Sequence, residues 1–344
     1  EVHAQNPVFA SAALNDAMRD AALAGHLPYL QSRAALDEEG LMRLQTGIGS
    51  EAFKADDFLC LACGVVSDAP AEALASLLSS LVELESGANV ALDILYMYFH
   101  CAKDDNKPIA NCLLVCGREL LKRADFSNGH SMRDHYAGAV AKICLAPPEA
   151  EEDAHVICIN LRTALMEFRT YSYNVNRLLE GLLQAQPDIA LDIFLSRDSA
   201  QNNHDPFDFG FDRSSPVESL DVATLCEWAD KDASARYPLL GTAISLFATK
   251  NFDQDAGLSP LFLEVMRHAP GKAEFLGDGY TRLLPSGWSG SLADILTRRR
   301  GMLGELASDP DPVVRSWYAE QRDRLDSWIA HERERESERE EGFE

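Results

Sequence analysis

Apolar residues recur along most of this chain at helical spacing, and turn-forming residues separate the runs. The clearest example is the stretch 291–330, where two such runs flank the turn Ser308-Asp309-Pro310. Asp311 is suited to cap the second helix, and Pro312 can occupy its first position, where a missing N–H costs nothing. The inward positions are Leu292, Ile295, Leu296, Met302, Leu303 and Leu306 in the first run, and Val314, Trp317, Tyr318, Leu325, Trp328 and Ile329 in the second. The pattern predicts two amphipathic helices joined by a tight turn.

A single helical hairpin cannot bury all of its apolar surface, so it needs neighbours of the same kind. The chain contains two similar segments, NVALDIL at 89–95 and DIALDIF at 188–194. Each follows a leucine-rich helical run, which indicates an internal repeat. Further helices are predicted over 51–66, 70–85, 107–125, 130–145 and 149–171. We therefore predict an all-α fold in which antiparallel helix hairpins stack into an α-solenoid, a superhelical array.

Residues 197–214 interrupt this pattern, because they show no helical period and form a long connection. We expect an N-terminal helical array over 1–196, an inserted loop over 197–214 and a C-terminal array over 215–330. The capping box Ser215-Pro-Val-Glu218 predicts a helix over 215–228, and further helices are predicted over 233–249, 259–268 and 272–284. Residues 331–344, rich in Glu and Arg, should extend the last helix as a charged tail.

The hairpin at 291–330 resembles a HEAT repeat, on the strength of the stretch Asp309-Pro-Asp-Pro-Val-Val-Arg315. The resemblance implies that Asp309 and Arg315 belong to a ladder between neighbouring hairpins, and that the array binds other macromolecules. Tyr318 departs from the repeat pattern, which prefers a small residue there. Residues 291–344 also resemble the ends of large bacterial signalling or defence proteins that carry helical sensor regions, which implies recognition of a foreign protein or effector control.

The formal net charge of −24 adds a constraint on partners. A field of this sign repels phosphate backbones and disfavours nucleic-acid binding, whereas a basic protein surface would be attracted. No apolar run has the length of a membrane span, and the first residues are not a secretion signal. We expect a cytoplasmic segment of a longer protein, with no membrane contact and with its eight cysteines reduced and mostly buried.

Candidate chemistry is sparse. The CxxC pair Cys60 and Cys63 lies in an apolar run with no second pair, and Cys112 and Cys116 share a helical face, so core packing is the preferred interpretation of both. His130 and His135 flank Asp134, which leaves an atypical hydrolase pocket as the alternative to a binding protein. The sequence contains no GxSxG, HExxH, P-loop or GxGxxG motif, and we expect neither a cofactor nor a metal.

Two segments are candidates for partner binding. Phe207, Phe209 and Phe211 alternate with acidic or small residues within the 197–214 loop, a pattern suited to a docking arm. Arg298, Arg299 and Arg300 form the densest basic cluster and are suited to an acidic or phosphorylated partner. The sequence thus predicts a non-catalytic module that binds a protein partner as a scaffold or regulator. A second alternative is an acidic mimic that occupies the site of a basic, nucleic-acid-binding protein.

Overall fold

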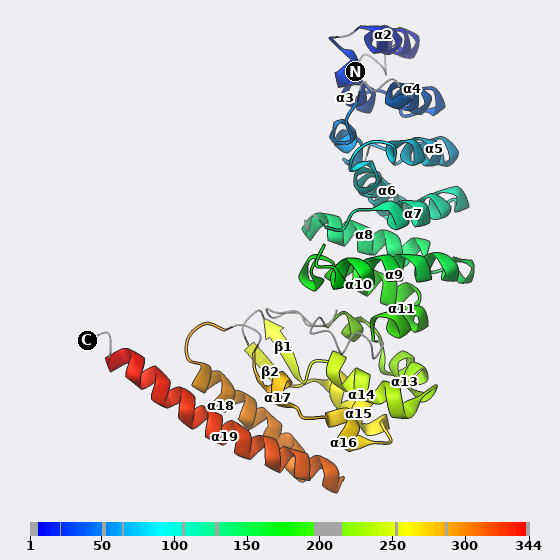
Figure 1. Cartoon of the computed structure of the whole chain (residues 1–344). Helices are drawn as coiled ribbons and strands as arrows, with labels where there is room; N and C mark the ends of the chain where they lie inside the picture. Colours follow the sequence, from blue (N-terminus) through cyan, green and yellow to red (C-terminus); the bar gives the residue numbers. More distant parts are fainter. Residues whose placement is uncertain are drawn as a thin grey trace. The chain divides into compact units, whose positions relative to one another are not determined.

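The computed structural model describes residues 6–20, 22–49, 53–63, 65–104, 107–127, 131–195, 215–251, 254–285 and 288–341. The chain forms two compact units, unit 1 (Glu1–Ile193) and unit 2 (Phe194–Glu344). The fold is all-α in class, with one two-stranded antiparallel hairpin among the described residues (Figure 1).

Unit 1 consists of helices throughout its described part. Its α-helices are α2 (Pro7–Arg19), α3 (Leu27–Ser32), α4 (Glu38–Gly49), α5 (Ala71–Leu81), α6 (Gly87–Asp104), α7 (Asn111–Arg123), α8 (Ser131–Cys144), α9 (Glu151–Met166), α10 (Asn176–Ala185) and α11 (Pro187–Phe194). Short 3₁₀-helices are η1 (Ala24–His26), η2 (Ala55–Ala62), η3 (Pro148–Ala150) and η4 (Ser172–Asn174). The α-helix predicted over 51–66 is therefore wrong in type, because the described part of that segment forms the tighter η2.

The helices of unit 1 pack in two layers. In the first layer α2, α4, α5, α7 and α9 each contact the next member. In the second layer α3, η2, α6, α8 and α10 do the same, and the hairpin partners α5 and α6, and α7 and α8, join the layers. Figure 1 shows these elements lying one above another. Each helix thus buries its apolar residues against neighbours on several sides.

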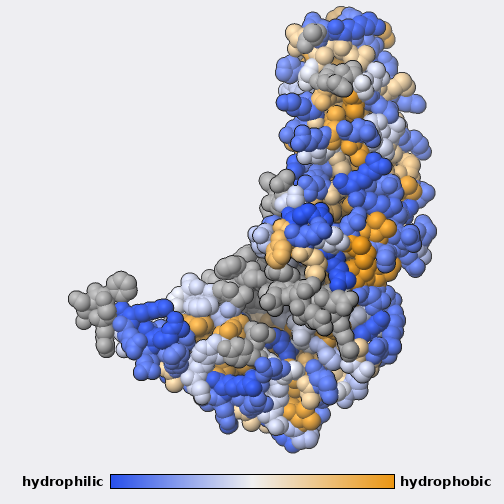
Figure 2. All heavy atoms as spheres, in the orientation of Figure 1, coloured by the Kyte–Doolittle hydropathy of each residue, from blue (hydrophilic) through white to orange (hydrophobic). Residues whose placement is uncertain are grey.

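The leucine-rich runs supply the core, as the sequence predicted. The buried leucines of α5 are fully inaccessible to solvent, and those of α10 are at most 1% exposed. They are Leu74, Leu77, Leu78 and Leu81 in α5, and Leu178, Leu179, Leu182 and Leu183 in α10. Burying one such side chain contributes about 1.5–3 kcal/mol before conformational entropy is subtracted. Figure 2 shows hydrophilic residues over much of the visible surface, with hydrophobic residues in patches between them.

Two glycines allow α8 and α10 to pack backbone against backbone. A Cβ atom at Gly138 would overlap the main-chain carbonyl of Arg177, and one at Gly181 would overlap the carbonyl of Gly138. Among the described elements, these two helices share the most extensive contact. The close approach therefore depends on the missing side chains.

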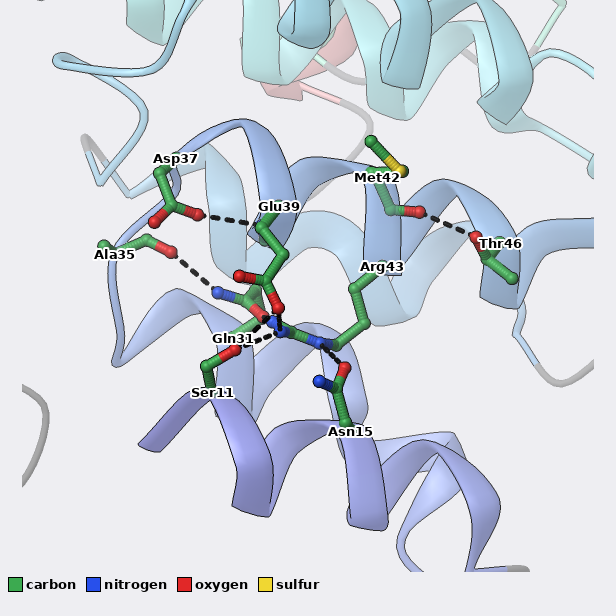
Figure 3. A network of polar contacts seen from close by, with 10 residues as sticks. Ser11, Asn15, Gln31, Ala35, Asp37, Glu39, Met42, Arg43 and Thr46 are labelled. Atoms are coloured by element: carbon green, nitrogen blue, oxygen red, sulfur yellow. Dashed lines mark hydrogen bonds and ion pairs between the residues drawn. The ribbon is translucent and has the colours of Figure 1, made fainter. Parts of the chain in front are cut away.

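A buried arginine joins the first three α-helices of unit 1 (Figure 3). Arg43 of α4 donates from Nε to Asn15 Oδ1 (2.7 Å), from Nη1 to Gln31 Oε1 (2.5 Å) and from Nη2 to Ser11 Oγ (2.8 Å) and Glu39 Oε1 (2.9 Å). Its side chain is 4% exposed. Burial of this charge is tolerated because its N–H groups find acceptors on α2, α3 and α4.

Unit 2 contains η5 (Pro216–Ser219), α13 (Val222–Asp230), α14 (Ala233–Ala243), α15 (Pro260–His268), α16 (Lys272–Leu276), α17 (Tyr280–Leu283), α18 (Leu292–Leu303), η6 (Gly304–Ser308) and α19 (Pro312–Glu341). Its strands are β1 (Phe247–Asn251) and β2 (Gln254–Leu258). Arg282 of α17 donates to the carbonyls of Gly241 and Leu276, which joins α17 to the ends of α14 and α16. Burial lowers the pKa of Arg282 to about 10.

Several sequence predictions fail in unit 2. The helix predicted over 272–284 is interrupted after Leu276, which leaves α16 and α17 as separate short helices. The helix predicted over 233–249 ends at Ala243, and β1 follows it, pairing antiparallel with β2 so that Phe247 lies opposite Leu258. Both of these side chains are buried, so tertiary packing outweighs the helical spacing of the segment. The capping box at Ser215 is not formed either, because Ser215 makes no cap and Glu218 accepts the N–H of Ser245 (3.1 Å). The α-helix begins at Val222, and Asp221 caps it by accepting the N–H of Thr224 (2.8 Å).

The helices predicted at 291–330 are present as α18 and α19, which pack on one another. The charged tail continues α19 as far as Glu341, as predicted. Glu336 holds this continuation against the start of α18, since its carboxylate accepts Ser291 Oγ–H (2.8 Å) and Ala293 N–H (3.3 Å). The Ser291 hydrogen bond is the largest of the effects that lower the pKa of Glu336 below its ordinary 4.5.

Acidification should release this contact. A lowered carboxyl pKa means that the contact stabilises the fold above the ordinary value of 4.5 and that this stabilisation disappears as the pH falls through the lower folded pKa. We expect exchange of the Ala293 amide hydrogen, measured by NMR, to accelerate over that range relative to amides of the α18 interior. In Glu336→Gln the amide should exchange fast already at neutral pH, with a flatter pH profile. Equal profiles for the two proteins would contradict the assignment.

Candidate interaction surface

Four aromatic rings form a continuous cluster on the second layer of unit 1. Tyr96 and His100 come from α6, and His135 and Tyr136 come from α8. The rings of Tyr96 and Tyr136 stack with centroids 4.3 Å apart, and the ring of His100 stacks on Tyr96 at 6.0 Å. His135 Nε2 lies 3.2 Å from Tyr96 Oη. We call Tyr96, His100, His135 and Tyr136 the aromatic surface.

The helical periodicity of α6 explains why the rings of Tyr96 and His100 reach the surface. Val90, Ala91, Ile94 and Leu95 of α6 are fully buried, and Tyr96 and His100, four residues apart, lie on the remaining face. Both histidines are exposed and both tyrosines are partly exposed. A tyrosine suits this position because its ring packs on apolar neighbours while its hydroxyl group remains near water.

A small cavity lies one helical turn from the cluster. Asp93, Arg133 and Asp134 line it together with Asn174 of η4, and Arg133 Nε lies 3.9 Å from Asp93 Oδ2. Its volume of about 30 Å³ has room for one or two water molecules and is far below that of a substrate pocket. This cavity therefore has no room for a buried substrate.

The residues of the hydrolase alternative have structural partners. Asp134 is buried and accepts the N–H groups of Arg177 and Leu178 (both 2.9 Å), so it caps α10 from the neighbouring helix. Burial raises the pKa of Asp134, and the two N–H groups oppose that shift. His135 contacts Tyr96, and His130 lies outside the described residues. The structure thus uses Asp134 to position a helix.

The structure separates the three arginines of the predicted basic cluster. Arg298 is exposed on α18. Arg299 is buried, donates to the Leu283 carbonyl (3.1 Å) and lies over the Phe247 ring at 4.8 Å, so its place in the partner-binding set is corrected to a core position. Arg300 pairs with Asp326 of α19, from Nε to Oδ1 at 2.5 Å. The predicted docking phenylalanines, Phe207, Phe209 and Phe211, lie outside the described residues.

Asp309 and Arg315 act within their own hairpin. Asp309 Oδ1 accepts the N–H of Asp311 (2.9 Å), and Arg315 Nη1 donates to the carbonyls of Asp309 (2.5 Å) and Pro310 (2.8 Å). These bonds stabilise the turn between η6 and α19. Within the described part of the chain, neither side chain forms the inter-hairpin ladder that the repeat resemblance implies.

The cysteines are less uniformly buried than predicted. Cys116, Cys144, Cys158 and Cys226 are buried, whereas Cys60, Cys101 and Cys112 are partly exposed and Cys63 is exposed. Core packing is therefore the wrong interpretation for the CxxC pair, because η2 places Cys63 at the surface. Within the described ranges, no three His, Cys, Asp or Glu side chains are arranged to hold a metal ion.

Sequence reasoning missed the aromatic surface. The apolar pattern over 89–100 predicts a helix without a binding role, and His135 enters the predictions only through the hydrolase alternative. The local signal was present in Tyr96 and His100, which share one face of a largely apolar helix. The contact of Tyr96 with Tyr136, forty residues further along, could not be inferred from local spacing.

Comparison with known proteins finds no family model, curated protein or solved structure that matches this chain. No helix in the described part of the chain combines the length and apolar character needed to cross a membrane.

Proposed function

We propose that this chain is a non-catalytic protein-binding module, and that unit 1 is a HEAT-like α-solenoid that binds its partner through the aromatic surface. The partner class is a protein, bound in a scaffolding or regulatory role. The proposal rests on unit 1 alone and does not depend on the resemblance of residues 291–344 to bacterial sensor regions.

Layered packing supports the solenoid part of the proposal. Each member of a layer contacts its sequence-order neighbour in that layer, which is the arrangement of repeat proteins whose hairpins contact only adjacent hairpins. An array of helix hairpins contains no β-strands, whereas unit 2 contains the β1–β2 hairpin. The proposal is therefore confined to unit 1.

The aromatic surface carries the binding part of the proposal. Tyrosine is enriched among the residues that dominate binding energy, because its rigid ring buries a large area at low entropic cost. The ring of Tyr96 stacks on the rings of His100 and Tyr136. Its side chain therefore loses little conformational entropy when a partner binds. The commitment of Asp134 to the cap of α10 supports a non-catalytic role for the same region.

Removing either tyrosine ring should weaken retention of a partner. Proteins retained from an extract of the source organism by the immobilised chain would be identified by mass spectrometry and compared with those retained by Tyr96→Ala and Tyr136→Ala. Each variant should lower the affinity of a purified partner by about 2 kcal/mol, roughly 30-fold, measured by calorimetry. Circular dichroism would establish that each variant is folded.

Matched controls are available on the opposite layer. Val115 of α7 and Ile159 of α9 are apolar and exposed, at 41% and 39%, so Val115→Ala and Ile159→Ala should leave affinity unchanged. Equal losses in tyrosine and control variants would overturn the proposed surface. Binding should also persist in about 0.5 M salt, where charges are screened within a few ångström, whereas an acidic mimic would release its partner.

A further inference from the structure

An open groove lies in unit 2 between the C-terminal part of α19 and the segment that leads into α18. Its volume is about 790 Å³, which is within the range of sites that bind small molecules. The groove exists because α19 continues past the beginning of α18 (Figure 1). Glu336 already contacts Ser291, the cap of α18, so residues 337–341 of α19 extend beyond it.

Two tryptophans and two arginines line this groove. Trp288 comes from the segment before α18, whereas Trp328, Arg335 and Arg339 come from α19. The three α19 residues follow one another at intervals of seven and four positions, which are about two turns and one turn of a helix, so they share one face. Trp288 is 54% exposed and Trp328 is partly exposed. The groove therefore presents large aromatic surfaces to solvent beside two guanidinium groups.

The carboxylates of the groove are engaged by the protein itself. Glu332 is buried, and its Oε1 accepts a hydrogen bond from Arg335 Nη1 at 2.6 Å. Both oxygens of Glu336 accept hydrogen bonds from the start of α18. A guanidinium carries five N–H donors, and that of Arg339 has no hydrogen-bond partner among the described residues. Donors thus exceed the remaining acceptors, and the groove is complementary to an anionic group.

We propose that this groove binds a small molecule in which a planar aromatic ring is joined to an anionic group, a carboxylate or a phosphate. The ring packs on Trp288 and Trp328, and the anionic group accepts hydrogen bonds from Arg335 and Arg339. Glu332 already orients Arg335, so less side-chain entropy is lost when the anion binds. This inference goes beyond the proposed function, which concerns unit 1 alone.

The indole N–H signals in the NMR spectrum of the isotopically labelled full chain test the site. The chain has four tryptophans, and replacing each by phenylalanine in turn assigns the signals. Titration with naphthoate or with adenosine monophosphate, to millimolar concentration, should shift the signals of Trp288 and Trp328 along a saturating curve. The signals of Trp228 and Trp317 should stay in place, because these side chains are 2% and 7% exposed. Absence of any shift with both probes, or equal shifts of all four signals, would overturn the proposal.

Matched probes separate the contributions of the ring and the charge. Naphthylmethanol and adenosine keep the rings of the two probes and lack the charge, whereas cyclohexanecarboxylate keeps a charge and lacks a planar ring. Each should bind about tenfold more weakly than the corresponding charged aromatic probe. The tighter of the two charged probes identifies the anionic group as a carboxylate or a phosphate. Equal affinity for charged and uncharged probes would contradict the assignment of an anionic ligand.

Substitutions locate the site on α19 and the segment before α18. Arg339→Gln and Trp288→Ala should each weaken binding of the charged probe about tenfold, measured by calorimetry. Arg333→Gln is the matched control, because Arg333 lies on the same helix, does not line the groove and has its Nη2 3.5 Å from Thr297 Oγ1. This control should change the affinity less than about twofold. Equal losses in Arg339→Gln and Arg333→Gln would reduce the effect to general charge and overturn the site.

Discussion

Gly138→Ala is expected to destabilise unit 1 by about 3 kcal/mol, the upper range for overpacking a closely packed interface. The added methyl group would overlap the main-chain carbonyl of Arg177, which belongs to the first turn of α10 and cannot rotate away as a side chain can. Because Asp134 also holds that turn through the N–H groups of Arg177 and Leu178, α10 cannot shift without losing its cap. The same substitution at Gly181 should have a similar effect, since its methyl group would meet the carbonyl of Gly138.

Urea titration followed by two probes measures this loss. All four tryptophans, Trp228, Trp288, Trp317 and Trp328, belong to unit 2, so their fluorescence reports that unit, while far-ultraviolet circular dichroism reports helices in both. The circular dichroism midpoint attributed to unit 1 should fall in Gly138→Ala. An unchanged midpoint would mean that α8 and α10 do not approach as closely as described.

Gly49→Ala is the matched control in the same unit. Gly49 ends α4, and a Cβ atom there meets nothing within 4 Å. Alanine lowers the entropy of the unfolded chain and suits a helix, so this variant should be unchanged or stabilised by up to about 1 kcal/mol. Opposite signs for the two substitutions would separate the effect of crowding from the effect of helix propensity.

Arg43→Met is expected to cost about 2–3 kcal/mol, because it removes the donor for several acceptors at once. Methionine is similar in length and apolar, so the space is largely filled, but Gln31, which is 1% exposed, loses the partner of its Oε1 atom. An unsatisfied buried acceptor costs about 1–3 kcal/mol. The contacts to Asn15 and Ser11 on α2 are also lost, so the attachment of α2 should weaken most.

Hydrogen exchange locates this effect. Amides of α2 and α3 should exchange faster in Arg43→Met, whereas amides of α8 and α10 should be unaffected. Arg33→Met is the control, because Arg33 is exposed and its guanidinium lies over the Tyr29 ring at 5.0 Å, a contact worth about 0.5–1 kcal/mol. If both variants lose the same stability, the Arg43 network contributes no more than a surface contact.

The candidate surface and the exposure of the CxxC segment could be predicted only in part from the sequence. The CxxC spacing is visible, but its exposure depends on η2 forming a 3₁₀-helix with Cys63 at its end. The aromatic surface brings α6 and α8 together, so its four rings become neighbours only after the hairpins pack. Neighbouring arginines of α18 illustrate the same limit of local sequence patterns, because the side chain of Arg299 is buried and that of Arg298 is exposed.

By itself, the sequence determined the all-α class, most helix positions in unit 1, the buried leucine faces of α5 and α10, and the extension of α19 through the charged tail. These features follow from local spacing, which fixes the face of a helix on which each side chain lies. Tertiary structure alone decided the ending of α14 and the pairing of β1 with β2, the use of Asp134 as the cap of a helix forty-three residues away, and the close approach of Gly138 to Gly181. The physical reason is that a strand, a cap across two helices and a backbone contact each depend on a partner distant in sequence, which local periodicity does not specify.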